Sequence, residues 1–170
     1  MKTVYIETSI LSYLTGRPSR HVVAAAHQEL TRTWWDLHRR RFEVFISPLV
    51  EQESRRGDPD AARRRVEALS GVPMLEIVEQ AYELAAVFIA EGALPASAQD
   101  DATHIALAAV HGMDYLLTWN CRHIANAEIK PMVRSVCAVH GYTCPEICTP
   151  EELTGGEDEG RPHTQRTVGH

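Results

Sequence analysis

The 170-residue sequence predicts an α/β protein whose central, mostly parallel sheet of four to five strands lies between two helical layers. Two observations predict this class. Short runs rich in β-branched and aromatic residues alternate along the chain with longer segments of helical periodicity. One helical segment, residues 102–110, is apolar nearly all round, as expected of a helix that packs on the face of a sheet.

The first quarter of the chain predicts one strand and two helices. Residues 2–6 favour a strand, because they are mainly β-branched and aromatic and contain no helix breaker. Either Thr8 or Ser9 is placed to cap a short helix that follows. A long helix is predicted over residues 21–41, because apolar residues recur there every three or four positions. These residues are Val23, Ala26, Leu30, Trp34 and Leu37.

A second strand, over residues 43–47, precedes two further helices. Pro48 suits the first turn of a helix, where its missing N–H is not needed. Asp58 followed by Pro59 has the cap-then-proline order that begins a helix, here expected to run to about residue 69.

The second half of the chain continues the alternation. Strands are predicted over residues 74–78, 115–118 and 144–149. Helices are predicted over residues 79–91, 101–111 and 129–140. The second of these helices is expected to be capped by Asp100 or a neighbour and closed by Gly112.

Composition indicates an ordinary globular domain, with 44% hydrophobic and 24% charged residues. Residues 1–152 are expected to form one domain, and the acidic segment 153–170 a disordered tail. No secretory signal or membrane span is recognisable, so a cytoplasmic protein without membrane contact is expected. The net charge of −6 argues against simple polycation-like binding to nucleic acid, although nine of the 17 basic residues fall between positions 32 and 65.

Four acid or amide side chains follow strand-like runs or begin an apolar helix; they are Glu7, Glu53, Asp101 and Asn120. Because parallel strands end at one edge of a sheet, where ligands bind, these side chains are expected to meet there. Gathered carboxylates repel one another unless a divalent cation holds them, so the pattern predicts a site for a hard metal and phosphodiester chemistry. Taken singly, Glu7 or Asp101 could instead cap a helix.

Four segments resemble the motifs of PIN-domain ribonucleases, particularly the VapC-like toxins of bacterial toxin–antitoxin pairs. They are residues 4–11 (VYIETSIL), 46–53 (ISPLVEQE), 101–106 (DATHIA) and 116–120 (LLTWN). In the second motif the acid follows the Ser by six residues, which selects Glu53 over Glu51. The resemblance covers most of the chain before the acidic tail.

The resemblance implies a three-layer α/β/α PIN-like domain with Mg²⁺- or Mn²⁺-dependent endoribonuclease activity. It implies that Glu7, Glu53 and Asp101 hold the metal, with Asn120 directed toward it or toward a bound water. Its implied partners are an RNA substrate, a small antitoxin and a second copy in a homodimer.

Substrate contacts are expected beside these acids. Thr8 or Ser9 could bond a ligand carboxylate or the scissile phosphate, whereas Thr118 could equally bond the backbone at its strand end. Three arginines on segments that lead from the predicted edge are candidates for the RNA backbone: Arg17, Arg55 and Arg56.

Two positions depart from the family pattern. Glu7 stands where the first acid is usually Asp, and Asn120 stands where the fourth is usually Asp. An amide carries no charge and should weaken a second metal, so a catalytically weak or inactive module that binds RNA or protein is the alternative hypothesis. A phosphoacceptor receiver domain is disfavoured, because it requires a late Lys and this chain has only Lys2 and Lys130.

Several other side chains lie close to these motifs. His104 shares a helix face with Asp101 and is expected to pack or to support a ligand rather than to bind the metal. His123 is close to Asn120 in the sequence and could approach a phosphate, but it is expected to be a loop histidine without a task. Trp34 and Trp35 are expected to lie in the core or at an interface. Trp119 is expected to pack, with stacking on a base as the alternative.

Overall fold

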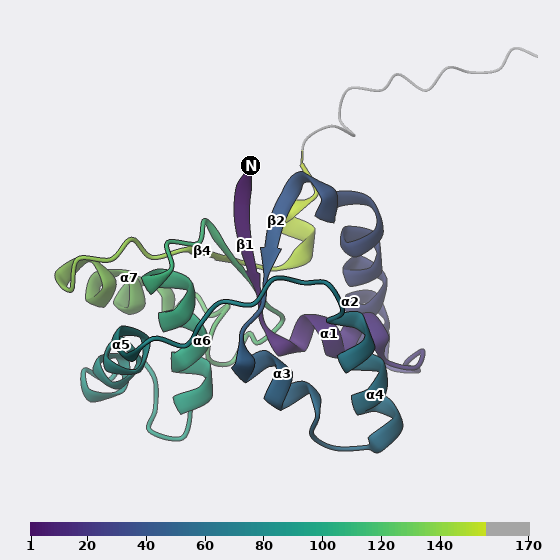
Figure 1. Cartoon of the computed structure of the whole chain (residues 1–170), viewed down its shortest axis with the longest axis horizontal. Coiled ribbons are helices and arrows are strands. Elements are labelled where there is room, and N and C mark those ends of the chain that lie inside the picture. Colours follow the sequence, from purple (N-terminus) through teal and green to yellow (C-terminus); the bar gives the residue numbers. More distant parts are fainter. Residues whose placement is uncertain (156–170) are drawn as a thin grey trace, which may run out of the picture.

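The computed structural model describes residues 1–155 of the chain. At its centre lies a sheet of four parallel strands in the order β2-β1-β3-β4 (Figure 1). The strands are β1 (Lys2–Ile6), β2 (Phe42–Phe45), β3 (Tyr115–Leu117) and β4 (Glu146–Cys148). The predicted α/β class and parallel sheet are therefore confirmed.

Helices cover both faces of this sheet. Within the described residues they are α1 (Thr8–Thr15), α2 (Val22–Thr33), α3 (Pro48–Ser54), α4 (Pro59–Ala68), α5 (Glu79–Ala90), α6 (Gln99–Val110) and α7 (Lys130–Val139). Figure 1 shows α1–α4 on one side of the sheet and α5–α7 on the other. Accordingly, α1 packs against α2, α3 and α4, whereas α5 packs against α6 and α7. The three-layer α/β/α arrangement is thus confirmed.

Local sequence explains where several helices begin. Ser47 caps α3 and Asp58 caps α4, and each is followed by a proline in the first turn, as predicted. The predicted short helix is present as α1, but its predicted cap was wrong, because Glu7 rather than Thr8 or Ser9 is the N-cap. Thr8 and Ser9 already lie inside the helix, and the carboxylate of Glu7 accepts the Ser9 N–H at 2.7 Å.

The segment predicted as one helix over residues 21–41 changes its winding twice. After α2 comes the π-helix η1 (Trp34–His38) and then the 3₁₀-helix η2 (Arg39–Arg41). The predicted apolar stripe is also wrong in part: Trp34 is fully buried, but Val23 and Leu37 are each 68% exposed.

Polar side chains occupy part of the buried face of α2 instead. Gln28 accepts the Ser19 N–H at 3.0 Å and donates to the Arg17 carbonyl at 2.8 Å. Thr31 is fully buried and accepts the indole N–H of Trp119 at 2.7 Å. A buried polar side chain costs little folding free energy when it has a hydrogen-bond partner. The inward face of α2 can therefore include polar residues, and the apolar stripe did not identify it.

No strand forms over residues 74–78, where a fifth strand was predicted. Met74 makes a single parallel bridge to Ile46 beyond the end of β2, and the ladder stops there. Gly71 has a positive φ of 78°, which turns the chain just before this segment. The segment therefore touches the sheet edge at one point only.

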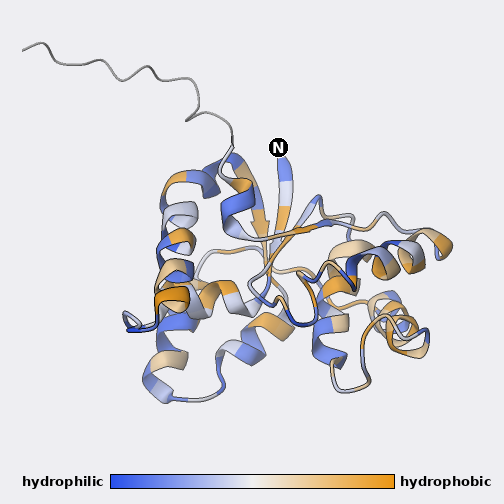
Figure 2. Cartoon of the chain, turned by 180° about the vertical axis from the view of Figure 1, so that it is seen from behind, coloured by the Kyte–Doolittle hydropathy of each residue, from blue (hydrophilic) through white to orange (hydrophobic). Residues whose placement is uncertain are grey.

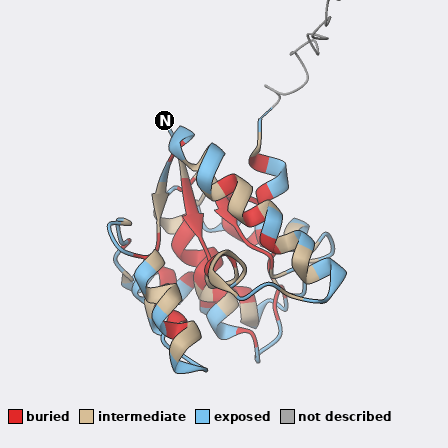
Figure 3. Ribbon diagram, turned by 90° about the vertical axis from the view of Figure 1, so that its right-hand side faces the viewer, coloured by how far each residue is buried: buried red, intermediate tan, exposed pale blue. Residues whose placement is uncertain are grey.

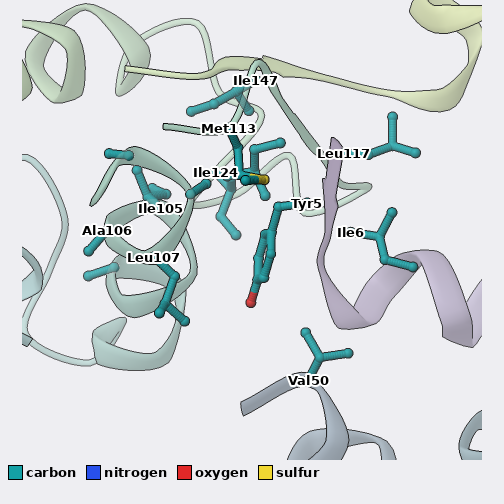
Figure 4. Close-up of a cluster of buried hydrophobic side chains, with 14 of the residues drawn as sticks. Tyr5, Ile6, Val50, Ile105, Ala106, Leu107, Met113, Leu117, Ile124 and Ile147 are labelled. Carbon is teal, nitrogen blue, oxygen red and sulfur yellow. The ribbon is translucent and has the colours of Figure 1, made fainter. Parts of the chain in front are cut away.

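The strands form the middle of the hydrophobic core. Figure 3 shows buried residues along the strands and on the inward faces of the helices, and Figure 2 shows hydrophilic residues on many outer faces. On β1, Tyr5 and Ile6 are fully buried, and Ile105 and Leu107 of α6 belong to the same cluster (Figure 4). Among residues 1–155, no helix is long and apolar enough to cross a membrane.

The last described element is the 3₁₀-helix η3 (Pro150–Leu153), which packs against α2 and η1. Leu153 is buried, and Arg41 donates to the Thr154 carbonyl at 2.9 Å, so packing continues slightly beyond the predicted domain end at residue 152. From residue 156 onward the predicted tail lies outside the described residues.

Candidate active site

The candidate site lies where β1 and β3 end. Ile6 pairs with Leu117, and the Glu7 N–H donates to the Leu117 carbonyl at 3.1 Å. Glu7 and Thr118 therefore leave the sheet at the same edge. Glu7 is 5% exposed, and its Oε1 accepts the Ser9 N–H at the start of α1. The positive end of a short helix thus faces a buried carboxylate.

Helix α3 carries Glu53 to the same place. Its Oε1 accepts the Thr8 hydroxyl at 2.7 Å and bonds His104 Nε2 at 2.5 Å. Glu51, two residues earlier, instead forms an exposed ion pair with Arg55 at 2.6 Å. The geometry therefore distinguishes the two acids of α3 in the way that the motif register predicts.

The first turn of α6 supplies Asp101. Its Oδ1 accepts the side-chain amide of Asn120 at 3.0 Å, and its Oδ2 bonds His123 Nδ1 at 2.9 Å. Asp100 does not cap the helix as predicted, because α6 begins after Ala98 with no side-chain cap; Asp100 pairs with Arg56 at 3.6 Å on the surface.

Asn120 has a defined orientation. Its Oδ1 accepts the His123 N–H at 3.0 Å, so its Nδ2 is the atom that donates to Asp101. The Asn120 backbone N–H donates to the hydroxyl of Thr118 at 2.9 Å. The amide oxygen is thus occupied by the chain, and Asn120 acts on Asp101 as a hydrogen-bond donor.

A buried polar chain stands behind these acids. His104 is 1% exposed and bonds Glu53 through Nε2 and the Tyr5 hydroxyl through Nδ1, the latter at 2.7 Å. The Tyr5 hydroxyl also bonds the Ser47 hydroxyl at 2.8 Å. The expectation that His104 supports an acid ligand or packs agrees with these contacts.

Burial and charge shift the ionisation of this cluster in different directions. Burial raises the pKa of Glu7, and the neighbouring Glu53 adds to the rise against the opposing effects of His104 and Ser9. Burial alone would raise the pKa of Glu53, but the hydrogen bond and charge of His104 outweigh it and lower that pKa.

The pKa of His104 is raised. Burial alone would lower it, but the hydrogen bond and charge of Glu53, together with the charges of Glu7 and Asp101, outweigh that effect. One imidazole thus faces the negative charge of all three acids.

The donor chemistry of the site fits a hard divalent cation, because its ionisable groups are mainly carboxylates. Both bonds to Glu53 converge on Oε1, and within the described chain no partner occupies its Oε2. However, no group of three or more His, Cys, Asp or Glu side chains in residues 1–155 is gathered closely enough to hold a metal. To bind one, Asp101 would exchange hydrogen bonds with Asn120 or His123 for the cation.

The predicted substrate residues divide into two groups. Thr8 and Ser9 are partly buried beside the acids, whereas Thr118 is fully buried, and its hydroxyl accepts a backbone N–H. The arginines lie further out: Arg17 pairs with Asp60 at 3.3 Å, and Arg55 pairs within α3. The structure therefore brings the hydroxyl residues together with the acids, whereas Arg17 and Arg55 pair with other carboxylates. Arg56 lies nearer, because its charge helps to lower the pKa of Glu53.

His123 is the site residue that sequence reasoning missed. It was expected to have no task, yet it bonds Asp101. The available signal was its position three residues after Asn120, a spacing at which an Asn side chain commonly accepts a backbone N–H. Trp119 packs as expected, since it is buried and stacks on His27 with ring centroids 3.9 Å apart.

Comparison with known proteins identifies the fold. The VapC20 toxin of Mycobacterium tuberculosis, which is described as cleaving the sarcin-ricin loop, is similar with a TM-score of 0.56 and 18% identity, over 71% of this chain and 92% of that one. VapBC2 from Rickettsia felis, solved bound to a fragment of its promoter DNA, is similar with a TM-score of 0.56 and 14% identity, over 86% of this chain and 98% of that one.

No protein-family model and no curated protein matches the sequence. At these low identities the structural likeness establishes the fold, which is that of a VapC-like PIN domain.

Proposed function

We propose that this protein is a metal-dependent endoribonuclease that hydrolyses RNA phosphodiester bonds, as the toxin of a type II toxin–antitoxin pair. The observation that carries the proposal is that His104 bonds Glu53 at the carboxyl edge of the sheet and lies within the influence of the charges of Glu7 and Asp101. The shared fold with a toxin described as cleaving the sarcin-ricin loop supports it. The nuclease body would reach slightly past residue 152, because Leu153 is buried in it, and the acidic segment that follows would be a tail.

In this proposal Glu7, Glu53 and Asp101 hold Mg²⁺ or Mn²⁺. The cation, when bound, supplies a Lewis acid that activates water and neutralises charge on the phosphoryl group. Thr8 orients the Glu53 carboxylate through its hydroxyl, and Asn120 orients Asp101 through its amide.

The substrate would lie across the outer face of this edge. The Ser9 hydroxyl accepts the Trp119 N–H and would donate its own proton to a phosphate oxygen. Thr8 would do so only by giving up its bond to Glu53. Arg17, Arg55 and Arg56 would reach the RNA backbone by exchanging their exposed carboxylate partners for phosphates.

A second candidate function is a PIN-like module that binds RNA or a protein but cleaves weakly or not at all. Two observations favour it: the uncharged Asn120 has its oxygen occupied, and the three acids do not form a closed metal-binding group within residues 1–155.

Cleavage of a mixed RNA pool by the purified full-length chain tests the two functions, with Mn²⁺, Mg²⁺ or EDTA present. We expect metal-dependent cutting, slowed about a hundredfold or more by Asp101→Asn, because a metal ligand supplies several kcal/mol of transition-state stabilisation. The matched control is Asp100→Asn, which changes the adjacent, exposed acid of the same helix. Equal cutting by Asp101→Asn, or no cutting with either metal, would contradict the nuclease proposal.

We also propose that α2 presents a partner surface. Val22 and Val23 are 85% and 68% exposed, and Leu37 in η1 is 68% exposed, although such side chains usually favour burial. A small antitoxin or a second copy of the chain would cover them. Sedimentation analysis of the wild type and of Val23→Lys measures the second possibility: equal monomeric mass for both would exclude a homodimer through this face.

A further inference from the structure

A chain of buried polar groups runs from one helical layer to the other through the first strand. It links Ser47 before α3, Tyr5 on β1, His104 on α6 and Glu53 on α3, through contacts of 2.8, 2.7 and 2.5 Å. Ser47 and Tyr5 are fully buried, and His104 is 1% exposed. Figure 4 shows the Tyr5 hydroxyl directed toward α3, on the side of Val50.

The direction of the last bond follows from the chemistry of its partners. An ionised carboxylate accepts hydrogen bonds only, so His104 Nε2 carries a proton and donates to Glu53. The ring cannot rotate away from Glu53 without breaking its Nδ1 bond to Tyr5. Tyr5 is in turn held by the rigid strand β1 and by Ser47.

This buried polar chain lowers the stability that the core would otherwise have. Burying hydroxyls and an imidazole costs free energy that apolar side chains of similar volume would not incur. The net contribution of this polar chain to the stability of the fold is therefore small. Both hydrogen bonds to Glu53, from Thr8 on one side and from His104 on the other, fall on the same oxygen, Oε1. The second oxygen, Oε2, is left without a partner in the described part of the chain.

We propose that His104, locked by Tyr5, is a positioning residue that fixes the Glu53 carboxylate so that Oε2 faces the cation. This inference rests on the proposed metal-dependent function and assigns the polar chain a task within it. Hydrogen-bonding partners of metal ligands set ligand orientation, and their loss commonly weakens metal binding or activity about 10- to 100-fold.

The test is Mn²⁺ affinity, measured by calorimetry on the full-length chain without RNA. His104→Leu removes the donor and should raise the dissociation constant about tenfold or more. His104→Gln keeps an N–H that can reach Glu53 and should recover part of this loss. Tyr5→Phe deletes one hydroxyl, leaves the charge of the site unchanged and should produce a smaller loss than His104→Leu.

Thermal unfolding of the same variants separates positioning from packing. If His104 only filled space, the apolar Leu variant would be at least as stable as the Gln variant and both would bind Mn²⁺ like the wild type. Positioning predicts instead that Gln binds Mn²⁺ more tightly than Leu whichever variant is more stable. The matched control is His111→Gln, which changes the other histidine of this helical region, bonded to the Glu76 carbonyl; its Mn²⁺ affinity should stay within about twofold of wild type.

The possible results of these measurements distinguish the inference from the proposed function. Unchanged affinity in folded His104→Gln and Tyr5→Phe overturns the inference, and so does tighter binding in His104→Leu, which would mean that the imidazole competes with the cation. A wild type that neither binds Mn²⁺ nor cuts RNA overturns the proposed function and the inference with it. A wild type that binds Mn²⁺ through Asp101 and cuts RNA, beside variants of unchanged affinity, overturns the inference alone.

Discussion

An acidic side chain has opposite surroundings at the two ends of the sheet. At the amino end, Asp114 precedes β3, where it accepts the Thr3 N–H at 2.8 Å and the Thr3 hydroxyl at 3.1 Å and pairs with Lys2 at 3.5 Å. At the carboxyl end, Glu7 is almost completely buried, accepts one backbone N–H and faces another carboxylate.

The shifts in pKa follow this difference. The Thr3 backbone N–H, together with the Thr3 hydroxyl and Lys2, lowers the pKa of Asp114, whereas burial raises the pKa of Glu7. The ionised form of Asp114 therefore stabilises the fold, and the ionised form of Glu7 destabilises it. Because the ionised side chain of Glu7 lowers the stability of the fold, a functional role explains its presence better than a structural role does.

The largest effect is expected on RNA cutting, from a substitution at the carboxyl end of the sheet. Glu53→Gln should slow metal-dependent RNA cutting about a hundredfold or more, because it removes a charged ligand from the candidate site. Glu51→Gln, in the same helix but paired with Arg55 on the surface, should cut at nearly the wild-type rate. If both variants lost the same amount of cutting activity, the site would depend on the total negative charge of α3 and not on the position of the Glu53 carboxylate.

The second prediction concerns the cost of Glu7. Glu7→Gln keeps an acceptor for Ser9 but removes the buried charge, so in EDTA it should raise the free energy of unfolding by about 1 kcal/mol. Because the pKa of Glu7 is raised in the fold, this gain should be present above the folded pKa and disappear below about pH 4.5, the value of an unperturbed glutamic acid. Denaturant titrations at several pH values measure it.

Mn²⁺ should stabilise the wild type against heat and fail to stabilise Glu7→Gln. A Glu7→Gln protein that is less stable than wild type at neutral pH in EDTA would contradict the assignment of Glu7 as a costly, functional acid.

The smallest effect is expected at the amino end. Asp114→Ala should lower the free energy of unfolding by about 1 kcal/mol or less, since the side chain is 37% exposed and solvent screens its ion pair. Because the pKa of Asp114 is lowered in the fold, its contribution is present above its ordinary value of about 3.8 and is lost as the pH falls through the folded pKa.

Denaturant titrations at neutral and acid pH measure that contribution, with Asp36→Ala as the control for an exposed acid. RNA cutting should not change in Asp114→Ala. A loss of cutting there would break the comparison, because it would connect the amino end of the sheet to the chemistry.

Local chemistry carried much of the prediction. The strand over residues 2–6, the proline starts of α3 and α4 and the end of α6 at Gly112, with a φ of 66°, all depend on neighbouring residues alone. The expected strand over residues 74–78 failed because pairing with β2 requires a partner at the right place, and only one bridge forms there.

The exposed stripe of α2 shows a second limit. Spacing indicated that Val23 and Leu37 would be inward, yet the buried face includes Gln28 and Thr31. Their partners, Ser19, the Arg17 carbonyl and Trp119, come from other segments, and sequence periodicity contains no information on those contacts.

The sequence alone determined the four strands that form, the parallel sheet and the four acid or amide positions that could reach its carboxyl edge, because these follow from local propensity and the geometry of parallel strands. Only the tertiary structure decided how those side chains are used. Glu53 and His104 are 51 positions apart and meet because α3 and α6 approach across the end of β1, where Tyr5 joins them. Contacts between distant segments depend on how whole elements pack, and this is why the task of His123 and the buried chain behind Glu53 were not predictable from spacing.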